Sequence, residues 1–304
     1  MSVAAAGAPN LLAGLRPPPG RADAPAFEHG WREGDGPAAP FLSYLAGTEA
    51  VGWSADLEAM HEGSSLEHPI DVLTREVAVA ALRGAALPAA PAILDVGCSS
   101  GHLLGDLRAS WPDAALAGVD AEDAGLAGAH ARVPDAALMH ASATDLPLAD
   151  GVVDGLVALN LLEHLPDDEA ALREFARVMR PGARAVVVVP SNPRLYDYYD
   201  AHLQHARRYA PGELAGRARS AGLRPLAGIS LGSVVYPGFW LVKTRNRRLN
   251  PTPEEARVRV EADIARSSGS PLARGAFALE RALLRRGARP SRGIREALVM
   301  ERPE

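Results

Sequence analysis

The 304-residue chain contains one cysteine, one lysine and few aromatic side chains, which make up 5% of it. The single cysteine, Cys98, excludes an internal disulfide and is typical of a reducing compartment. No apolar run reaches the roughly 18 residues that a membrane-spanning helix needs, and the start of the chain lacks the basic region of a secretory signal. We therefore expect a cytoplasmic protein with a full hydrophobic core, in which Cys98 is a small buried residue.

The charges are unevenly distributed along the chain. Residues 1–200 carry 12 basic and 28 acidic side chains, whereas residues 201–304 carry 20 basic and 9 acidic ones. Two explanations stay open. Either the two parts pack against each other or pair in a homodimer, or the basic part attracts an anionic acceptor. Aromatic side chains are not interleaved with the arginines of the final stretch, so we expect no nucleic-acid partner.

The most informative stretch is ILDVGCSSGHLL, which begins at Ile93. Residues 93–96 form a short apolar run typical of a buried strand. Gly97 and Gly101 then allow a sharp turn and a close approach of the backbone to a ligand, and a helical pattern begins at His102. A strand, a Gly-rich turn and a helix N-terminus together predict a site for a nucleotide-like ligand.

Three chemistries share this pattern. A dinucleotide site, G-x-G-x-x-G, fits poorly because Ser99 and His102 occupy the positions of its second and third glycines. A hydrolase nucleophile elbow, G-x-S-x-G, matches residues 97–101, but the preceding chain shows neither strand-like alternation nor an H-G-G run for an oxyanion loop. In the third, an S-adenosylmethionine (SAM) site, Asp95 holds the ammonium end of the cofactor.

The spacing of later acidic residues favours the SAM site. Residues 116–120 predict a second strand that ends in a carboxylate 23 residues after Gly97, where it can accept hydrogen bonds from both hydroxyls of a ribose. Residues 136–140 predict a third strand. Shortly after it, Asp145 can accept a hydrogen bond from an adenine amino group, with Leu146 against the ring.

Four motifs in this order resemble the class I SAM-dependent methyltransferases of the small-molecule type: ILDVGCSSGHLL, GVDAED, ASATDLPL and VVDGLVALNLLEHLPD. The resemblance covers about residues 90–230. It implies a Rossmann-like α/β fold with a seven-stranded, mainly parallel sheet, an antiparallel last strand and helices on both faces. The family's middle glycine is Ser99 here, which narrows the turn but keeps its N–H donors.

The resemblance also implies the chemistry. SAM would donate a methyl group to an O, N or C atom of a small molecule, anionic or lipid-like, and become S-adenosylhomocysteine. The alternative is a SAM-binding protein of the same fold that transfers no methyl group, either cyclase-like or a scaffold. The expected cofactor contacts are Asp95, Gly97, Cys98, Ser99, Gly101, Asp120, Ala121, Thr144, Asp145, Leu146 and Asn160.

Five parts of the chain are expected. Residues 1–40, rich in Ala, Gly and Pro, predict a mobile arm. Residues 41–90 predict a helical lid, in which His61 or His68 either faces the ligand or lies on a partly exposed helix surface. Residues 91–230 form the SAM-binding core, residues 231–292 a cap insertion over the acceptor pocket, and residues 293–304 the last core strand.

The fourth motif predicts a buried strand at residues 152–159, with Asn160 at its carboxyl end, where open α/β sheets bind ligands. His164 follows and is a candidate general base, because an unperturbed imidazole titrates near neutral pH. A structural hydrogen bond at a helix start is the equal alternative. Residues 185–189 predict a central strand, and Asp167 or Asp168 is expected to cap the helix before it.

Residues 194–209 contain four of the six tyrosines, together with histidines and arginines. This composition predicts an acceptor-facing loop whose aromatic faces can also support the sulfonium, or alternatively a strut in which the arginines pair with the acidic half. His202 and His205 are further candidate bases. Histidines three residues apart without a nearby carboxylate predict no metal site. The candidate acceptor contacts are Tyr196, Tyr199, Arg208 and Tyr209.

The cap is expected between strands at residues 223–229 and 294–300, the latter antiparallel. Residues 229–242 are uncharged and partly aromatic, and four cations follow within six residues. This pattern predicts either a segment packed on the core or peripheral contact with an anionic membrane surface or a lipid-like chain.

Overall fold

The computed structural model of the protein describes residues 11–32, 36–45 and 68–304. Its main sheet contains β3 (Leu42–Ser43), β4 (Ala92–Val96), β5 (Ala115–Asp120), β6 (Ala137–His140), β7 (Val153–Leu159), β8 (Met179–Pro190), β9 (Arg224–Leu231) and β10 (Arg295–Glu301). The spatial order is β3-β6-β5-β4-β7-β8-β10-β9. Strand β10 is antiparallel to both of its neighbours, and the other pairs are parallel.

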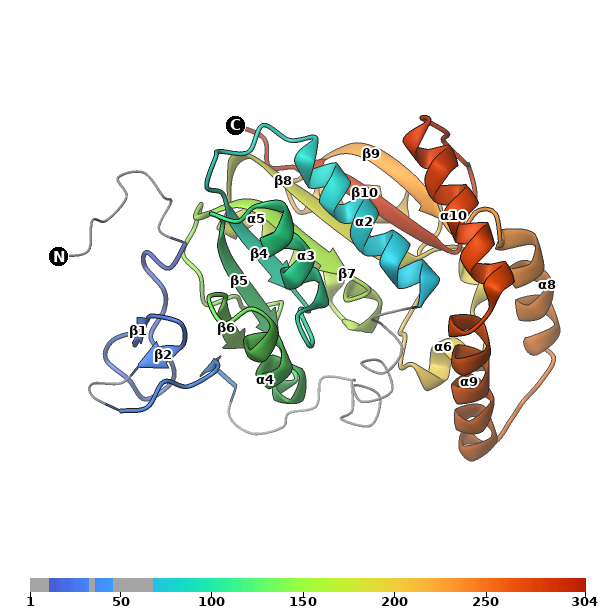
Figure 1. Cartoon of the computed structure of the whole chain (residues 1–304), viewed down its shortest axis with the longest axis horizontal. Helices are drawn as coiled ribbons and strands as arrows, with labels where there is room; N and C mark the ends of the chain where they lie inside the picture. Colours follow the sequence, from blue (N-terminus) through green and yellow to red (C-terminus); the bar gives the residue numbers. More distant parts are fainter. Residues whose placement is uncertain (1–10, 33–35, 46–67) are drawn as a thin grey trace.

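Helices cover both faces of this sheet (Figure 1). They are α2 (Pro69–Arg83), α3 (His102–Ser110), α4 (Asp123–Arg132), α5 (Asp168–Val178), α6 (Tyr198–His202), α7 (Glu213–Ser220), α8 (Tyr236–Asn246), α9 (Pro253–Ser268) and α10 (Pro271–Arg285), with 3-10 turns η1 (Leu162–His164) and η2 (Pro193–Leu195).

The strands alternate their side chains between two apolar cores. Ile93 of β4 packs with α2, α3 and α4 on the face toward the viewer in Figure 1, through residues such as Leu82 and Leu104. Its neighbour Leu94 packs with α5 and α7 on the other face, through residues such as Phe175 and Leu214. Both faces of the central strands are buried, which explains why their sequences are continuously apolar. The predicted Rossmann-like fold and antiparallel last strand are confirmed.

The N-terminal prediction is wrong for the described residues. Trp31 is 2% exposed, and its indole Nε1 donates to the carbonyl of Leu138 at 2.7 Å. It belongs to a small hairpin of β1 (Ala26–Phe27) and β2 (Trp31–Arg32), and Leu11 and Leu15 are also buried. A few large apolar anchors hold residues 11–32 on the core, although Ala, Gly and Pro surround them.

The sheet has an eighth strand, since β3 pairs in parallel with β6 at one edge. Residues 42–43 are therefore extended and not helical as predicted. Helix α2 is present, and residues 46–67 of the expected lid lie outside the described part of the chain.

The segment between β9 and β10 contains α8, α9 and α10, which lie together at the right of Figure 1. Helix α9 contacts α6, and α10 contacts α2. Among the described residues, none of the helices combines the length and apolarity that crossing a membrane requires.

Candidate active site

A hollow lies at the carboxyl edge of the sheet, between the turn after β4, the end of β7 and helix α2. This is the place where open α/β sheets bind ligands. Its lining residues come from these elements and from the start of α3: Asp71, Thr74, Arg75, Asp95, Gly97, Cys98, Ser99, Ser100, His102, Leu103, Leu159 and Asn160.

Left-handed backbone conformations shape the turn after β4. Gly97 and Gly101 have φ of 78° and 77°. A Cβ added at Gly101 would lie 2.9 Å from the backbone of Ala129, so only glycine fits there. Ser99 adopts φ 43°, and its N–H donates to Asp120 Oδ2 at 2.7 Å. The turn is thereby fixed to the end of β5, and the N-terminus of α3 faces the hollow.

Asp95 is buried beneath this turn with 2% exposure. Burial, together with the charge of Asp120, raises the pKa of Asp95 to about 8. Its Oδ2 has no hydrogen-bond partner among the described residues. A buried carboxyl oxygen without a partner is costly, so the position suits a cation brought by a ligand. The ammonium group of SAM fits this requirement.

Asp120 stands at the end of the neighbouring strand β5. Its Oδ2 accepts from Ser99, and its Oδ1 accepts from the backbone N–H of Glu122 at 3.0 Å. A carboxylate has about four lone-pair positions, and a carboxylate at the end of this strand is the group that the sequence predicts for the hydroxyls of a ribose. Asp95 lines the hollow and Asp120 holds the turn beside it, and their contacts with the two polar ends of SAM stay predictions.

Residues 144–146, the third segment predicted to bind the cofactor, contact other parts of the protein. Both carboxylate oxygens of Asp145 accept from Arg16 at 2.8 Å, and this pair is largely exposed. Thr144 bonds with Ser142, and Leu146 is buried in the core. None of the three predicted residues lines the hollow, so the adenine contact of Asp145 stays a prediction.

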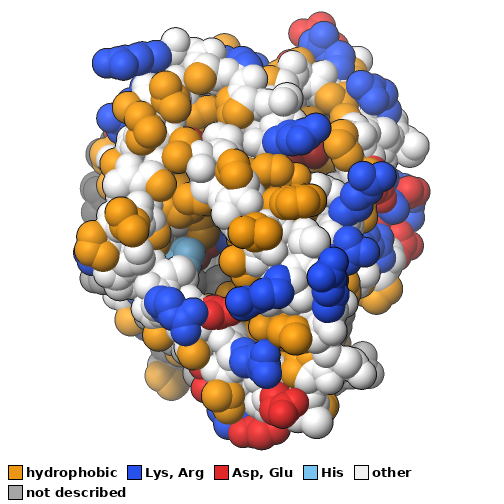
Figure 2. Space-filling view, turned by 90° about the vertical axis from the view of Figure 1, so that its right-hand side faces the viewer, with side chains coloured by type: hydrophobic (Ala, Val, Ile, Leu, Met, Phe, Trp, Pro, Cys, Tyr) orange, Lys and Arg blue, Asp and Glu red, His pale blue; other side chains and the backbone are white. Residues whose placement is uncertain are grey.

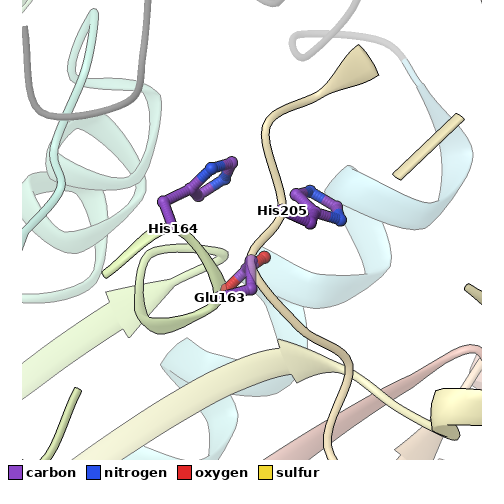
Figure 3. Close-up of side chains that lie close together, drawn as sticks. All are labelled: Glu163, His164 and His205. Atoms are coloured by element: carbon purple, nitrogen blue, oxygen red, sulfur yellow. The ribbon is translucent and has the colours of Figure 1, made fainter. Parts of the chain in front are cut away.

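A second polar group lies where β7 ends. Glu163 and His164 belong to η1, and the ring of His205 packs edge-on against that of His164 with centroids 4.9 Å apart. Figure 3 shows these three side chains close together, with the two imidazoles above the carboxylate. The backbone N–H of Ala206 donates to the carbonyl of Glu163 at 2.7 Å and joins the two segments.

Glu163 is 1% exposed, and burial raises its pKa to about 8. Its Oε2 has no hydrogen-bond partner among the described residues. Nδ1 of His205 lies 3.0 Å from Asp200 Oδ1 and must carry the proton, because a carboxylate only accepts. Burial lowers the pKa of His205, which favours the neutral ring.

Asp200 is the centre of a buried charge cluster. Lys243, the only lysine of the chain, is 3% exposed and donates to Asp197 at 2.6 Å and to Asp200 at 2.9 Å. Arg208 Nε donates to Asp200 at 2.7 Å. Although burial opposes ionisation, the hydrogen bond from His205 and the two cations hold the pKa of Asp200 below its usual value.

The structure separates the three candidate bases. His164 and His205 lie together, whereas His202 lies on α6 and its nearest charges are Glu261 and Arg257 of α9. His202 is therefore not part of the group at the end of β7, and its role as a base stays a prediction.

Two of the predicted acceptor contacts are also wrong. Tyr209 is fully buried, and its hydroxyl donates to Asp168 at 2.5 Å. Arg208 is 8% exposed and is used by Asp200 and the carbonyl of Ser191. Both are structural residues. For Tyr196 and Tyr199 the acceptor contact stays a prediction.

Helix α2 contributes residues that sequence reasoning missed. Asp71, Thr74 and Arg75 line the hollow, and Arg295 Nη1 donates to Asp71 at 2.6 Å. His68, at the start of this helix, bonds with Ser267 of α9 at 2.9 Å, and His61 lies outside the described residues. Glu163 was also missed, although a carboxylate inside the apolar segment LLEHL was a usable signal.

Comparison with known proteins agrees with this geometry. A methyltransferase domain family matches residues 94–187. Over 187 residues the chain is 29% identical to the ubiquinone/menaquinone biosynthesis C-methyltransferase UbiE of Syntrophotalea carbinolica, covering 57% of this chain and 79% of the relative. Over 194 residues it is 30% identical to the O-methyltransferase cnsE of Penicillium expansum, covering 59% and 67%.

Solved structures show the same fold. A geranyl diphosphate C-methyltransferase from Streptomyces coelicolor A3(2), in complex with Mg²⁺, geranyl diphosphate and S-adenosyl-L-homocysteine, superposes with a TM-score of 0.52 at 16% identity, covering 77% of this chain and 80% of that chain. The motifs, the fold and the relatives agree, and the chain belongs to the class I SAM-dependent methyltransferases, with SAM as its cofactor.

Proposed function

We propose that this methyltransferase transfers the methyl group of SAM to an O, N or C atom of a small molecule bound beneath α8–α10, beside the ends of β7 and β8. One observation carries the proposal: the cofactor turn and the group at the end of β7 are direct neighbours. A Cβ at Gly97 would lie 3.2 Å from the side chain of Leu161, the residue before η1. An acceptor near His164 therefore lies next to a cofactor held by the turn.

The residues of the turn would hold the cofactor in the following way. Asp95 binds the ammonium group, Asp120 binds the ribose, and Asn160 closes the hollow at the end of β7. Bound SAM supplies a methyl group on a positively charged sulfur. The protein contributes by fixing the two reactants next to each other, which is worth several kcal/mol of the barrier, about 7–11 in well-oriented intramolecular reactions.

The surface supports an acceptor with an apolar skeleton. Figure 2 shows a hollow bordered by hydrophobic side chains with a histidine inside it, and Lys and Arg side chains gather beside it. By its name, one relative is a C-methyltransferase of ubiquinone/menaquinone biosynthesis, and the solved structure named above is a C-methyltransferase of geranyl diphosphate. An anionic or lipid-like acceptor is the class that this surface suits.

The cap also supports peripheral membrane contact. Trp240, Leu241 and Val242 of α8 are 48%, 65% and 45% exposed, and exposed arginines follow them. Binding to vesicles of anionic lipid, absent with neutral lipid, would support this surface contact. A homodimer in solution that is lost when these exposed residues are replaced would instead show that a second copy covers this face. We also propose a cytoplasmic location, where the buried Cys98 stays reduced.

The function is tested by incubating the protein with SAM and pooled cell metabolites. S-adenosylhomocysteine should accumulate together with a product one methylene heavier than a metabolite of the pool, as measured by mass spectrometry. The Asp95→Asn variant is the matched control and should form far less of both. Binding of SAM without any S-adenosylhomocysteine would instead identify a SAM-binding protein that transfers no methyl group.

The role of the two paired histidines is tested separately. His164→Ala and His205→Ala should lower turnover while SAM affinity, measured by calorimetry, stays within about twofold. An acceptor proton must be removed when the methylated atom is a hydroxyl or amine, and an imidazole near the end of β7 is a suitable base for this step. Equal loss of SAM affinity and turnover would indicate a structural role.

A further inference from the structure

We propose that Glu163, His164 and His205 form a binding site for one divalent first-row transition-metal ion at the acceptor end of the active site. One potential ligand atom of each residue lies within 4.8 Å of the other two. Nitrogen and oxygen ligands at about 2.0–2.2 Å from a common ion are roughly 3–4 Å apart, so small side-chain rotations bring the three atoms onto one ion. Figure 3 shows the imidazoles and the carboxylate around a common space.

The buried carboxylate of Glu163 is the first observation that points to a cation. It is 1% exposed, and its Oε2 accepts no hydrogen bond from the described residues. Burial of a carboxylate without a partner is unfavourable because the group loses its water, and a coordinated cation offsets this loss. Glu163 and His164 are adjacent on the η1 turn, and His205 reaches the same place from the loop after α6.

The surroundings of His205 are the second observation. Its Nδ1–H donates to Asp200 at 3.0 Å, which leaves Nε2 with a free lone pair. A metal-binding histidine typically donates its other N–H to a carboxylate, which fixes the tautomer and the ring orientation. Asp200 is 0% exposed and is itself held by Lys243 and Arg208. The buried charge cluster thus acts as the support of one ligand.

The backbone holds the two ligand-bearing segments together. Ala206 N–H donates to the carbonyl of Glu163 at 2.7 Å, and the hydroxyl of Tyr196 donates to the carbonyl of His205 at 2.7 Å. Because these bonds fix the backbones of both segments, small side-chain rotations are enough to bring the three ligand atoms onto one ion. Such pre-organisation is what a binding site of fixed geometry requires.

The ligand set indicates the kind of ion. Two imidazoles and one carboxylate suit Zn²⁺, Fe²⁺, Co²⁺ or Ni²⁺, whereas Mg²⁺ and Ca²⁺ prefer oxygen ligands alone. Three protein ligands leave positions open for an oxygen of the acceptor. This last role rests on the proposed function, and metal binding itself does not. A hydroxyl bound there would have a lowered pKa, and His164 and His205 would then act as ligands and not as bases.

The sequence predicted no metal site because it paired His202 with His205. The carboxylate comes instead from Glu163, which lies 42 residues before His205. His202 is consequently a matched control, since it is a half-buried histidine of the same segment that faces α9.

The test uses the full chain without a histidine tag, stripped of metal with a chelator and titrated with Zn²⁺ or Co²⁺. Wild-type protein should bind one ion per chain, and Co²⁺ should give the visible absorption of a site with nitrogen ligands. Glu163→Gln and His205→Ala should each weaken binding by about 100-fold or more, and His202→Ala should leave it unchanged. SAM affinity, measured in every variant, should stay near the wild-type value and shows that the fold is kept.

Three outcomes would overturn the site: no stoichiometric binding by the wild-type protein, unchanged binding by Glu163→Gln, or equal losses in His202→Ala and His205→Ala. Glu163→Gln keeps the size of the side chain. Its metal affinity therefore tests the site even if His205→Ala fails to fold. Metal binding without methyl transfer would contradict the proposed function alone, and methyl transfer without metal binding would contradict this inference alone.

Discussion

The cofactor side and the acceptor side of the active site are built in different ways. The cofactor side comprises Asp95, the turn at residues 97–101 and Asp120, all within 26 consecutive residues, and its hydrogen bonds link adjacent elements. The acceptor side depends on partners that are far apart in sequence. Lys243 bonds with Asp200 across 43 residues, and Tyr209 bonds with Asp168 across 41. Local backbone chemistry shapes the first, and long-range charge pairing shapes the second.

Long-range ion pairs also explain the uneven distribution of charge along the chain. Basic residues of the last third pair with acidic residues of the first two thirds, as in Arg295 with Asp71 at 2.6 Å and Arg217 with Asp168 at 2.8 Å. The buried pairs of Lys243 follow the same rule. These contacts support the explanation that the two parts pack against each other.

Lys243→Ala should give the largest change in stability, because it removes the cation from the buried charge cluster of the acceptor side. The substitution leaves the buried carboxylates of Asp197 and Asp200 without their shared cation, and we expect a loss of roughly 3–5 kcal/mol in the free energy of unfolding. Denaturant unfolding measures this loss. The exposed Arg245 of the same helix is the matched control, and Arg245→Ala should change stability by less than about 0.5 kcal/mol. Similar values for both variants would contradict the prediction.

Asp95→Asn should change the pH dependence of stability on the cofactor side. In the folded, ligand-free protein the pKa of Asp95 is about 8, against 3.8 for an unperturbed Asp, so the unfolded chain releases this proton first. The stability that Asp95 contributes is therefore complete below pH 4 and is lost as the pH rises to about 8. At pH 8 the variant should be more stable than the wild type by roughly 2–4 kcal/mol, whereas at pH 4 the two should be similar.

The same variant should bind SAM more weakly by about 10–100-fold, since a charge-assisted hydrogen bond to the ammonium contributes about 1.5–3 kcal/mol. Calorimetry at one pH measures this change. A variant that is both more stable and equally able to bind SAM would show that Asp95 does not contact the cofactor.

Ser99→Gly tests whether the backbone alone shapes the cofactor side, because it removes a side chain from the turn and keeps the N–H donors. Ser99 has φ 43°, a conformation that costs a non-glycine residue about 1–2 kcal/mol. Glycine removes this conformational cost, but it also has greater freedom in the unfolded chain, which offsets part of the stabilisation. We therefore expect a net increase of about 0.5–1 kcal/mol in the free energy of unfolding. SAM affinity should stay within about twofold. A clear loss of affinity would reveal a contact between the Ser99 hydroxyl and the ligand.

Arg16→Ala should have the smallest effect. Its ion pair with Asp145 is exposed, with side-chain exposures of 48% and 65%, so its loss should change stability by less than about 1 kcal/mol. SAM affinity is the informative measurement. An unchanged value agrees with Asp145 lying outside the hollow, and a stronger affinity would indicate that Arg16 competes with the adenine for Asp145.

Much of the sheet was predictable because the central strands β4 and β7 and the second half of β8 are apolar runs ended by turns. The turn after β4 was predictable for a similar reason, since Asp95, Gly97 and Gly101 lie in one motif. Two-residue strands such as β3 give no periodic signal, and the burial of Trp31 depends on a surface made by distant residues.

The acceptor side was harder to predict because its residues are polar whether they face a ligand or the interior. Tyr209 and Arg208 have the composition of a binding loop, but Asp168 and Asp200 draw them inward. Lys243 stands in a row of cations that left both a core-packed segment and membrane contact open, and it is buried between two carboxylates. Only the fold reveals which charges are neighbours.

The position of α8–α10 in the chain has an evolutionary consequence. These helices leave the sheet from its outermost strand, β9, and return through β10 beside it, so both attachment points lie at one border. Strands β4 and β5, which carry the SAM motif, are separated from that border by β7 and β8. Changes in this insertion would leave the strands of the SAM motif in place, and they would reach the cofactor hollow through the contacts of α9 and α10 with α2. A lineage that alters this one module therefore changes the acceptor side first.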